Sequence, residues 1–400
     1  MRFFTLFVSL STLLLPAILA APAPPSVAIE SVPGPKSGRH IVLLKPGVAR
    51  SGVFSKIASV RGGKSGDGIT HEYSSVLNGF TGTFDNATLA ALQTTPGVEA
   101  IVEDSVVKAS ASQTNAPWGL ARVNSKRRLG CLDGQLTYTY NYDPKAGQGV
   151  NIYVIDTGIR VTHTDFGARA KWAATFGGYA DQDGNGHGTH CAGSAVGGRY
   201  GVAKLANVFA IKVLSDAGSG FASDVISGME YAMTAAQASG KPSVVSMSLG
   251  GGVNSAIDAA AKNLVASGVH TVVAAGNDNA DAANTSPARV PEVITVAATT
   301  ITDERASFSN FGSLIDIFAP GQNIISTWKD SDTATAMLSG TSMATPHVAG
   351  LVAYLISVNG NMTPAAMRQK IRDLSLIGLV NPYTLPSGHV NMVINNRYQN

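Results

Sequence analysis

Three short motifs place a carboxylate, an imidazole and a hydroxyl beside glycine. Asp156 stands between the apolar pair Val-Ile and a Thr-Gly turn, and His187 stands in Asp-Gly-Asn-Gly-His-Gly-Thr-His. Ser342 stands in Ser-Gly-Thr-Ser-Met-Ala-Thr-Pro-His, directly before an apolar run with helical character. A serine hydroxyl attacks a carbonyl when an imidazole takes its proton and a carboxylate orients that imidazole. These residue types predict acyl transfer by Asp156, His187 and Ser342.

A fourth motif supplies a hydrogen-bond donor. Asn277 follows the apolar run Val-His-Thr-Val-Val-Ala-Ala and one glycine, and its side-chain amide can donate to a developing oxyanion. Ser342 is expected at the N-terminus of a helix, where free backbone N–H groups and the helix dipole favour an anion. The Asn277 side chain and the Ser342 backbone N–H are therefore the predicted oxyanion donors.

Each motif alone has a simpler explanation. An aspartate before a glycine turn is usually a capping residue, a serine at a helix start is usually an N-cap, and an asparagine after a strand is usually a turn residue. A metal site at His187 and His190 is a further alternative. Their three-residue spacing encloses no glutamate, and no third ligand is evident. Catalysis is favoured because the four motifs occur together.

Short β-branched apolar runs alternate with helical patterns from Trp118 onward. The runs are nearly unbroken, as strands buried on both faces of a sheet should be. They are residues 150–155, 207–214, 243–249, 269–275 and 293–298, and helices opened by serine or asparagine are predicted at 223–239 and 254–267. The alternation predicts an α/β fold with a mostly parallel central sheet and helices on both faces. Ligands bind beyond the carboxyl ends of such strands, which is where Asp156 falls.

The N-terminal part has a different organisation. Residues 1–20 combine a basic start, an apolar stretch and a small-residue end, which predicts a signal peptide and secretion. A membrane anchor is the alternative, but Ser, Thr and Pro interrupt the stretch and no basic cluster follows. Residues 21–37 form a Pro-rich linker. Residues 38–109 predict a small α+β unit, and residues 110–400 the large domain, with a processing boundary near residues 109–111.

Inside the small unit, the pattern predicts a strand at 40–46 and a hairpin-like pair at 69–84. A helix at 87–94, opened by Asn86, and a last strand at 98–109 follow.

Bulk composition excludes several classes of function. The 400 residues have a formal net charge of +3, with 44% hydrophobic and 14% charged residues. This bias is too small to predict nucleic acid or an anionic membrane as a partner. No later run reaches the roughly 18 apolar residues of a membrane span.

Cys131 and Cys191 allow at most one disulfide; Cys191 is expected as a buried structural thiol, and Cys131 is left unassigned.

The four motifs together resemble those of the subtilisin-like serine proteases, most closely the proteinase K-like branch known from fungi. Val-Ile-Asp-Thr-Gly, Gly-His-Gly-Thr-His-Cys-Ala-Gly, Ala-Ala-Gly-Asn and Gly-Thr-Ser-Met-Ala-Thr-Pro-His-Val-Ala-Gly occur in the family's order. The resemblance implies a monomeric, secreted endopeptidase that cleaves proteins and peptides without an organic cofactor. It also implies that residues 38–109 are an inhibitory pro-segment and residues 110–400 a subtilisin-like peptidase domain.

The resemblance also implies a substrate-binding cleft. An extended peptide would pair with two glycine-rich edges as an added strand, and a roomy apolar pocket would follow, which predicts broad cleavage after apolar or aromatic residues. Ala222 stands where related enzymes often carry an aromatic lid, and Phe221 is its neighbour. The predicted cleft residues are Gly218, Ser219, Gly220, Ser248, Leu249, Gly250, Ala274, Ala275 and Gly276.

Calcium is the one metal that the resemblance implies. Pro291 and Val293 would bind it by their carbonyls and Asp316 by its carboxylate, as hard oxygen ligands suit Ca²⁺. The alternative is that Asp316 only ends a strand.

The disulfide cysteines of proteinase K have no counterpart in this chain. Asn-x-Ser/Thr acceptor sequences for glycosylation occur at Asn86, Asn284 and Asn361.

Two rival functions come from other classes. Gly340 to Ala344 nearly forms the nucleophile elbow of an α/β-hydrolase esterase, but in those enzymes the serine precedes its acid and base in the chain, whereas Ser342 comes last. A catalytically silent subtilase-fold binding module is the non-enzyme rival. All four catalytic positions are filled, which favours the enzyme.

Overall fold

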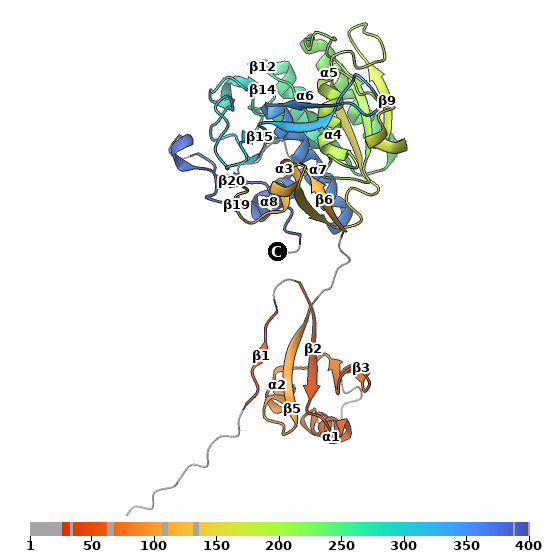
Figure 1. Cartoon of the computed structure of the whole chain (residues 1–400), viewed down its shortest axis with the longest axis vertical. Helices are drawn as coiled ribbons and strands as arrows, with labels where there is room; N and C mark the ends of the chain where they lie inside the picture. Colours follow the sequence, from red (N-terminus) through yellow and green to blue (C-terminus); the bar gives the residue numbers. More distant parts are fainter. Residues whose placement is uncertain are drawn as a thin grey trace, which may run out of the picture. The chain divides into compact units, whose positions relative to one another are not determined.

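The structure is a computed structural model of the whole chain, shown in Figure 1. It describes residues 26–32, 35–61, 68–105, 111–130, 136–386 and 389–398. The predicted signal peptide lies outside the described residues. The chain divides into two compact units, residues 1–108 and 109–400, and each is described by itself.

The first unit is a five-stranded sheet with two helices. The sheet has the order β1-β5-β2-β4-β3, and β1 is the strand that runs parallel to its neighbour. Apolar residues of both helices pack with the sheet in one core. The elements are β1 (Ile29–Glu30), β2 (Lys36–Leu44), α1 (Arg50–Val60), β3 (Ile69–Tyr73), β4 (Gly79–Gly82), α2 (Asn86–Gln93) and β5 (Val98–Ser105).

This small unit confirms the predicted strands, the hairpin and the helix, with three differences. Helix α1 was not predicted from the sequence. Its apolar spacing is weak, since Val53 and Ile57 are its buried residues. The cap of α2 is Asp85 rather than Asn86, because the Asp85 carboxylate accepts the Thr88 N–H at 2.8 Å. The predicted linker at 21–37 contains β1 and the start of β2.

The second unit is organised around a nine-stranded sheet of order β19-β20-β16-β15-β13-β11-β8-β10-β9. Its strand pairs are parallel except for β19 with β20. The five strands predicted for this sheet are β8, β10, β11, β13 and β15, so the parallel architecture is confirmed. The strands are β8 (Asn151–Asp156), β9 (Ala170–Thr175), β10 (Asn207–Lys212), β11 (Ser243–Met247), β13 (His270–Ala274), β15 (Ile294–Thr299), β16 (Ile317–Pro320), β19 (Leu376–Ile377) and β20 (Met392–Val393).

Helices cover both faces of this sheet (Figure 1). α4 and α7 pack against each other and against the central strands, whereas α5 and α6 contact each other and cover the other side. The helices are α3 (Trp118–Asn124), α4 (His187–Val196), α5 (Ala222–Ser239), α6 (Ser255–Ala266), α7 (Thr341–Asn359) and α8 (Pro364–Leu374), with short 3₁₀ turns η1 (Thr164–Arg169), η2 (Ala282–Asn284) and η3 (Pro382–Thr384). Asn254 caps α6 as predicted, but α5 begins after Phe221 without a side-chain cap.

Three small two-stranded sheets complete the unit. The pair β12 (Gly251–Gly252) with β14 (Thr285–Ser286) lies next to the end of β11. The others are β6 (Ala111–Ala116) with β7 (Tyr138–Tyr142), and β17 (Ile324–Thr327) with β18 (Thr335–Leu338).

Helix α7 is the centre of the core. It is long and apolar enough to cross a membrane by composition alone, yet 83% of that stretch is buried inside the unit, so it is a core helix.

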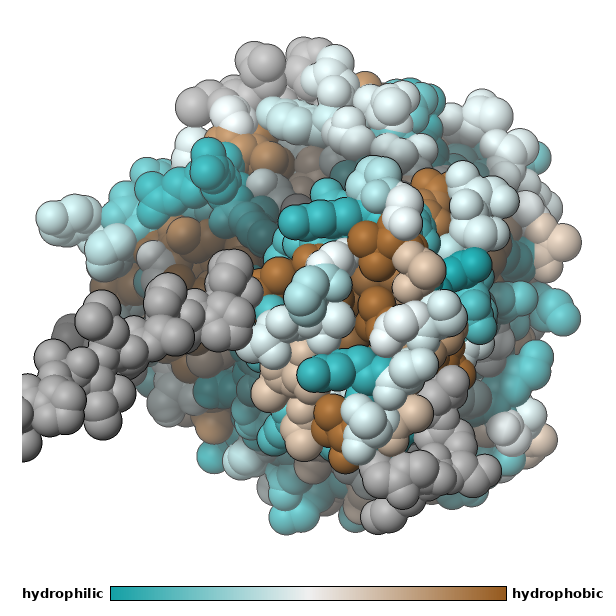
Figure 2. All heavy atoms as spheres, turned by 90° about the horizontal axis from the view of Figure 1, so that it is seen from below, coloured by the Kyte–Doolittle hydropathy of each residue, from teal (hydrophilic) through white to brown (hydrophobic). Residues whose placement is uncertain are grey.

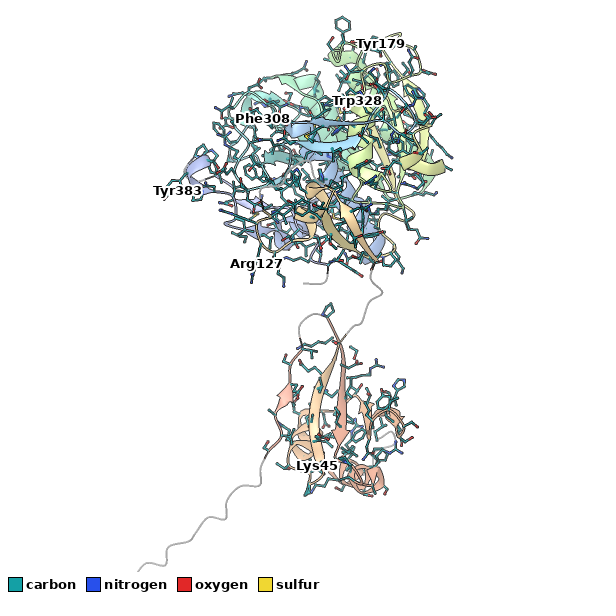
Figure 3. All side chains as sticks on the ribbon, in the orientation of Figure 1. Lys45, Arg127, Tyr179, Phe308, Trp328 and Tyr383 are labelled. Atoms are coloured by element: carbon teal, nitrogen blue, oxygen red, sulfur yellow. The ribbon has the colours of Figure 1, made fainter. Side chains whose placement is uncertain are left out.

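Among the exposed apolar side chains, Tyr383 projects from the surface with 96% of its area accessible (Figure 3). Figure 2 shows hydrophobic patches alternating with polar residues on one face.

Candidate active site

Asp156 is the last residue of β8, and its carboxylate is fully buried. Its Oδ1 accepts a hydrogen bond from Nδ1 of His187 at 2.7 Å and another from the Thr157 N–H at 2.7 Å. Because Nδ1 of His187 donates to the carboxylate, the ring's Nε2 is the nitrogen free to accept a proton. The structure therefore brings Asp156 and His187 together in a hydrogen-bonded pair.

His187 is the first residue of α4, and the glycine before it is structurally required. Gly186 has a φ of 103°, and a Cβ there would come within 2.7 Å of the Trp328 ring. A side chain would therefore be strained and also obstructed. The His187 side chain is 26% exposed, whereas that of Asp156 is inaccessible. The imidazole thus has one edge on the buried carboxylate and keeps some access to solvent.

The pKa of His187 is set by two opposing effects. Burial alone would lower the pKa of the imidazole, but the Asp156 carboxylate raises it, and the net result is a pKa well above 6.5. The protonated ring is stabilised by its carboxylate neighbour, which is the property that a proton acceptor needs during catalysis.

Ser342 lies in the first turn of α7, after Gly340 in the N-cap position. The Gly340 cap means that Ser342 is not itself the N-cap. Four positions further on, Pro346 has no N–H to offer the Ser342 carbonyl. That carbonyl instead accepts from the Ser248 hydroxyl at 2.9 Å and from the Cys191 thiol at 3.3 Å. A proline inside the helix thus ties the nucleophile segment to the neighbouring strand end and to α4.

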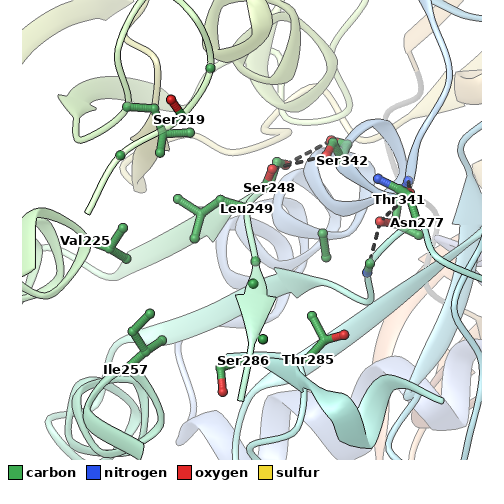
Figure 4. A pocket seen from close by; sticks show the side chains of 18 of the residues that line it. Ser219, Val225, Ser248, Leu249, Ile257, Asn277, Thr285, Ser286, Thr341 and Ser342 are labelled. Atoms are coloured by element: carbon green, nitrogen blue, oxygen red, sulfur yellow. Dashed lines mark hydrogen bonds between the residues drawn. The ribbon is translucent and has the colours of Figure 1, made fainter. Parts of the chain in front are cut away.

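The Ser342 hydroxyl donates to the Ser248 carbonyl at 3.1 Å, as the dashed lines in Figure 4 show. Within the described residues, no hydrogen bond joins it to His187. Both side chains line one cavity, and Cys191 lies 4.0 Å from Nδ1 of His187 while contacting Ser342. Catalytic hydrogen bonds are often incomplete before substrate binds. The Ser342 hydroxyl would have to turn away from the Ser248 carbonyl to reach His187.

Asn277 is held by its amide oxygen, and among the residues that the structure describes no hydrogen bond engages its amide nitrogen. Its Oδ1 accepts from the Thr341 N–H at 2.8 Å and from the Thr341 hydroxyl at 2.9 Å (Figure 4). Because both donors bind the oxygen, the orientation of the amide is fixed and its NH₂ group faces the cavity. This supports the predicted donor role for Asn277.

The cavity beside Ser342 has a volume of about 860 Å³. Most predicted cleft residues line it, but Ala275 does not, because it is buried in the sheet with its N–H on the Val296 carbonyl. Residues 218–220 and 248–250 line the cavity as loops rather than as strands. The lining that was predicted comprises Gly218, Ser219, Gly220, Ser248, Leu249, Gly250, Ala274 and Gly276, and further lining residues include Ala222, Val225, Ile257 and Asp278.

The metal alternative at His187 and His190 is not supported. Nε2 of His190 lies 3.0 Å from the Ile324 carbonyl, so the ring is bound to main chain. Burial lowers the pKa of His190 to about 3. Asp156, His187 and Cys191 do lie close enough to share an ion. However, the Asp156 carboxylate and Nδ1 of His187 are already joined by their own hydrogen bond, and the Cys191 thiol donates to the Ser342 carbonyl. Cys191 is a buried free thiol, as predicted, and Cys131 lies outside the described residues.

Asp183 is a residue whose role the sequence did not reveal. It stands in the histidine motif and is 8% exposed. Its Oδ1 accepts from the Thr157 hydroxyl at 2.9 Å and from the Gly186 N–H at 2.8 Å, and its Oδ2 accepts from the Thr189 N–H at 3.0 Å. Asp183 thus connects the segment after Asp156 to the first turn of the helix that carries His187. An acid three residues before the N-cap Gly186 was the available signal.

Comparison with known proteins agrees with this geometry. Residues 147–382 match the model of the subtilase family, and residues 39–110 match that of peptidase inhibitor I9. A cuticle-degrading protease of Metarhizium anisopliae is 42% identical over 96% of this chain and 97% of its own length. Proteinase R of Parengyodontium album is 42% identical over 97% of this chain and 99% of its own. A cold-adapted subtilisin-like serine proteinase of known structure is 43% identical, covering 70% of this chain and 98% of its own, with a TM-score of 0.64.

Fold, motifs and relatives together define a serine endopeptidase that carries an I9-type inhibitor segment. The chain belongs to the subtilase family, and its relatives place it with the fungal proteinase K-like enzymes. The esterase and the silent binding module are not supported.

Subtilases generally bind structural calcium, so the predicted ligand set has to suit that ion. Asp316 directly precedes β16 and is 1% exposed. Its Oδ1 lies 2.7 Å from Nη2 of Arg368 and 3.2 Å from Nη1 of Arg372, and its Oδ2 accepts the Thr295 N–H at 3.0 Å. Burial raises the pKa of the Asp316 carboxyl, although both arginines oppose that rise. With two guanidinium groups at its carboxylate, Asp316 as it stands does not fit a calcium ion.

Proposed function

We propose that Ser342 is the nucleophile, His187 the general base and acid, Asp156 the residue that orients the imidazole, and Asn277 an oxyanion donor. The observation that carries this proposal is the 2.7 Å hydrogen bond from His187 to buried Asp156, in a cavity that Ser342 also lines. The order of the roles follows from the chemistry of acyl transfer.

The reaction would start when substrate enters the cavity and the Ser342 hydroxyl turns from the Ser248 carbonyl toward Nε2 of His187. Oγ then attacks the scissile carbonyl carbon while His187 takes the hydroxyl proton. His187 returns that proton to the leaving amine as the C–N bond breaks, which leaves an acyl-enzyme. Water deprotonated by His187 attacks the ester in the same way and releases the acid.

The tetrahedral intermediates would be stabilised by two donors that exist before substrate arrives. Thr341 fixes the oxygen of Asn277 through two hydrogen bonds and so directs the NH₂ group into the cavity. The Ser342 backbone N–H lies in the first turn of α7, where N–H groups lack partners within the helix. Because neither donor has to reorganise during the reaction, both stabilise the developing charge.

We propose broad cleavage with preference for apolar or aromatic residues. The wall of the cavity away from Ser342 is formed by the apolar side chains of Val225, Leu249 and Ile257 (Figure 4). Ala222 contributes only a methyl group there, and the neighbouring Phe221 is 75% exposed outside the lining. An outer subsite with so small a side chain at its rim would admit a bulky apolar group. Asp278 is an exposed acid at the lining, so basic residues need not be rejected.

We further propose that the chain is secreted as an inactive precursor, with residues 1–20 as signal peptide, 21–37 as linker, 38–109 as inhibitory pro-segment and 110–400 as a monomeric peptidase domain. The match of residues 39–110 to an inhibitor family supports the pro-segment. The division between residues 108 and 109 supports a cut close to residue 110. Asn86, Asn284 and Asn361 are exposed and are the proposed glycosylation sites.

Replacement of the nucleophile tests the proposal. The Ser342→Ala chain is expected to accumulate as a folded precursor that is not cut near residue 110, whereas the unchanged chain matures. Ser339→Ala, in the same motif, is the matched control and should mature. Electrophoresis with N-terminal sequencing gives the readout, and a diisopropyl fluorophosphate label should be confined to chains that retain Ser342. Self-maturation or labelling of the Ser342→Ala chain would refute the nucleophile assignment.

A further inference from the structure

Both oxygens of the Asp316 carboxylate are bound by donors from this chain. Oδ1 receives Nε of Arg368 at 2.7 Å, Nη2 of Arg368 at 2.7 Å and Nη1 of Arg372 at 3.2 Å. Oδ2 receives the Thr295 N–H at 3.0 Å. Three guanidinium nitrogens therefore crowd Oδ1, and Oδ2 uses one of its two lone pairs for the Thr295 N–H.

The local charge also opposes a divalent cation. Arg368 and Arg372 bring two permanent positive charges to one buried negative charge, since a guanidinium does not lose its proton in proteins. The other acid of this segment, Glu292, is already paired with Lys262 at 3.0 Å. A calcium ion at Asp316 would therefore face two like charges at hydrogen-bond distance from its one anionic ligand.

The remaining members of the predicted ligand set do not favour an ion by themselves. Pro291 and Val293 would contribute main-chain carbonyls, which every residue type carries. Only a side chain can make such a site anionic, and Asp316 is the side chain concerned. The charge at Asp316 is therefore set by the pair of arginines on α8, four residues apart and on one face of the helix.

We propose that Arg368 and Arg372 take the place of a structural cation at Asp316, and that this arginine clamp fastens α8 to the central sheet. The clamp consists of Asp316, Arg368 and Arg372. Asp316 also binds the Thr295 N–H in β15, and its own N–H donates to the Thr295 carbonyl at 2.9 Å. One carboxylate thus joins β15, the start of β16 and α8. The clamp belongs to the chain itself and does not depend on calcium.

The first test asks whether calcium uses Asp316. Ser342→Ala serves as the background because it prevents self-digestion of the full chain. Equilibrium dialysis against calcium chloride should give the same number of bound ions for the Ser342→Ala chain and for the Ser342→Ala chain that also carries Asp316→Asn. Loss of one bound ion in the second chain would overturn the proposal. Crystals of the Ser342→Ala chain soaked in calcium chloride should show guanidinium groups against Asp316. An ion within bonding distance of that carboxylate would equally overturn it.

The second test asks whether the clamp holds α8. In the same background, Arg368→Ala and Arg372→Ala should each lower the melting temperature by about 5 °C, equally in calcium and in EDTA. Lys370→Ala, on the same helix, is the matched control and should melt with the parent. If an alanine variant does not fold, Arg368→Lys and Arg372→Lys keep the charge and should give a smaller shift. The clamp would be refuted if both arginine variants melted at the same temperature as the Ser342→Ala background. It would also be refuted if calcium, at the concentration used for that background, restored the stability of the variants.

Discussion

Asp156 and Asp316 are two buried carboxylates at the ends of parallel-sheet strands, with opposite surroundings. Asp156 binds an imidazole, whose charge can appear and disappear, and that ring opens onto the cavity. Asp316 binds two guanidinium groups, whose charge is permanent, and it has no place in the cavity lining. Both carboxylates are essentially inaccessible to solvent.

The two sites differ in the type of cation beside the carboxylate and not in the carboxylate itself. A buried carboxylate stabilises any cation beside it, and the type of cation determines whether that stabilisation serves catalysis or folding. Beside histidine, the stabilisation becomes available when the ring takes a proton, so it contributes to a reaction. Beside arginine, it is always present, so it contributes to the stability of the fold. Substitutions at the two sites should therefore separate activity from stability.

The largest expected effect is that of Asp156→Asn. An asparagine can keep the shape but favours the wrong tautomer of His187 and does not stabilise the imidazolium, so kcat should fall by about 10⁴-fold. The melting temperature should change little by comparison. Steady-state kinetics of the variant, after an unrelated protease has cut it near residue 110, together with calorimetry would measure both. A loss of kcat below tenfold, in a chain that still folds, would show that Asp156 does not act through His187.

The second expected effect is a rise of kcat/KM with pH. Below its pKa the His187 ring is protonated and cannot accept the Ser342 proton, so activity requires a pH above that pKa. Because the pKa of His187 is raised well above 6.5, the half-maximum should lie on the alkaline side of 6.5, with about a tenfold fall per pH unit well below it. A pH profile of kcat/KM checks this. A half-maximum below 6.5 would contradict the effect assigned to Asp156.

The third prediction concerns Asp183, whose replacement should lower both activity and stability. In Asp183→Asn an NH₂ group would replace one carboxylate oxygen and would face the N–H of Gly186 or of Thr189. The free energy of unfolding should fall by about 1–3 kcal/mol, because that N–H loses its acceptor. Because those donors belong to the first turn that carries His187, kcat should fall by about tenfold and the pH profile should shift. Asp181→Asn, at an exposed position in the same loop, is the control. A lower melting temperature with unchanged kcat and unchanged profile would leave Asp183 a purely structural residue.

The smallest effect on activity is expected for Asp316→Asn. No residue of the clamp lines the cavity, so kcat of the folded enzyme should stay within about a factor of two. Stability should fall by about 2 kcal/mol, because two charged hydrogen-bond donors lose their anion. Parallel measurements of kcat and of unfolding by denaturant separate the two. A large loss of kcat at full stability would remove the contrast between Asp156 and Asp316.

The elements that position the catalytic residues could be predicted because their sequence patterns are strong. Strands such as β8 and β13 are continuous apolar runs, which only a doubly covered parallel sheet accommodates. The motifs follow those strands directly or open a helix, so their convergence at one sheet edge follows from topology. The orientation of Asn277 was not predictable, because it depends on Thr341, which lies 64 residues away.

Long-range polar pairings were the part that sequence could not reveal. Arg368 and Arg372 look like ordinary exposed helix residues in the sequence, and only folding brings them to Asp316, more than 50 positions earlier. Local competition explains the smaller differences. Asp85 and Asn86 are both good caps, and backbone geometry selects the first. Helix α1 has too few apolar residues at helical spacing to be recognised.

Helix α7 has a consequence for how this enzyme is inactivated. Its first turn carries Ser342, while residues Met343 to Ile356 are almost wholly enclosed by the sheet and by α4. Ser342 therefore cannot be displaced without disturbing the hydrophobic interior. On heating, loss of catalysis and cooperative melting of the domain should coincide, and an intermediate that is folded yet catalytically incompetent at this serine should not accumulate.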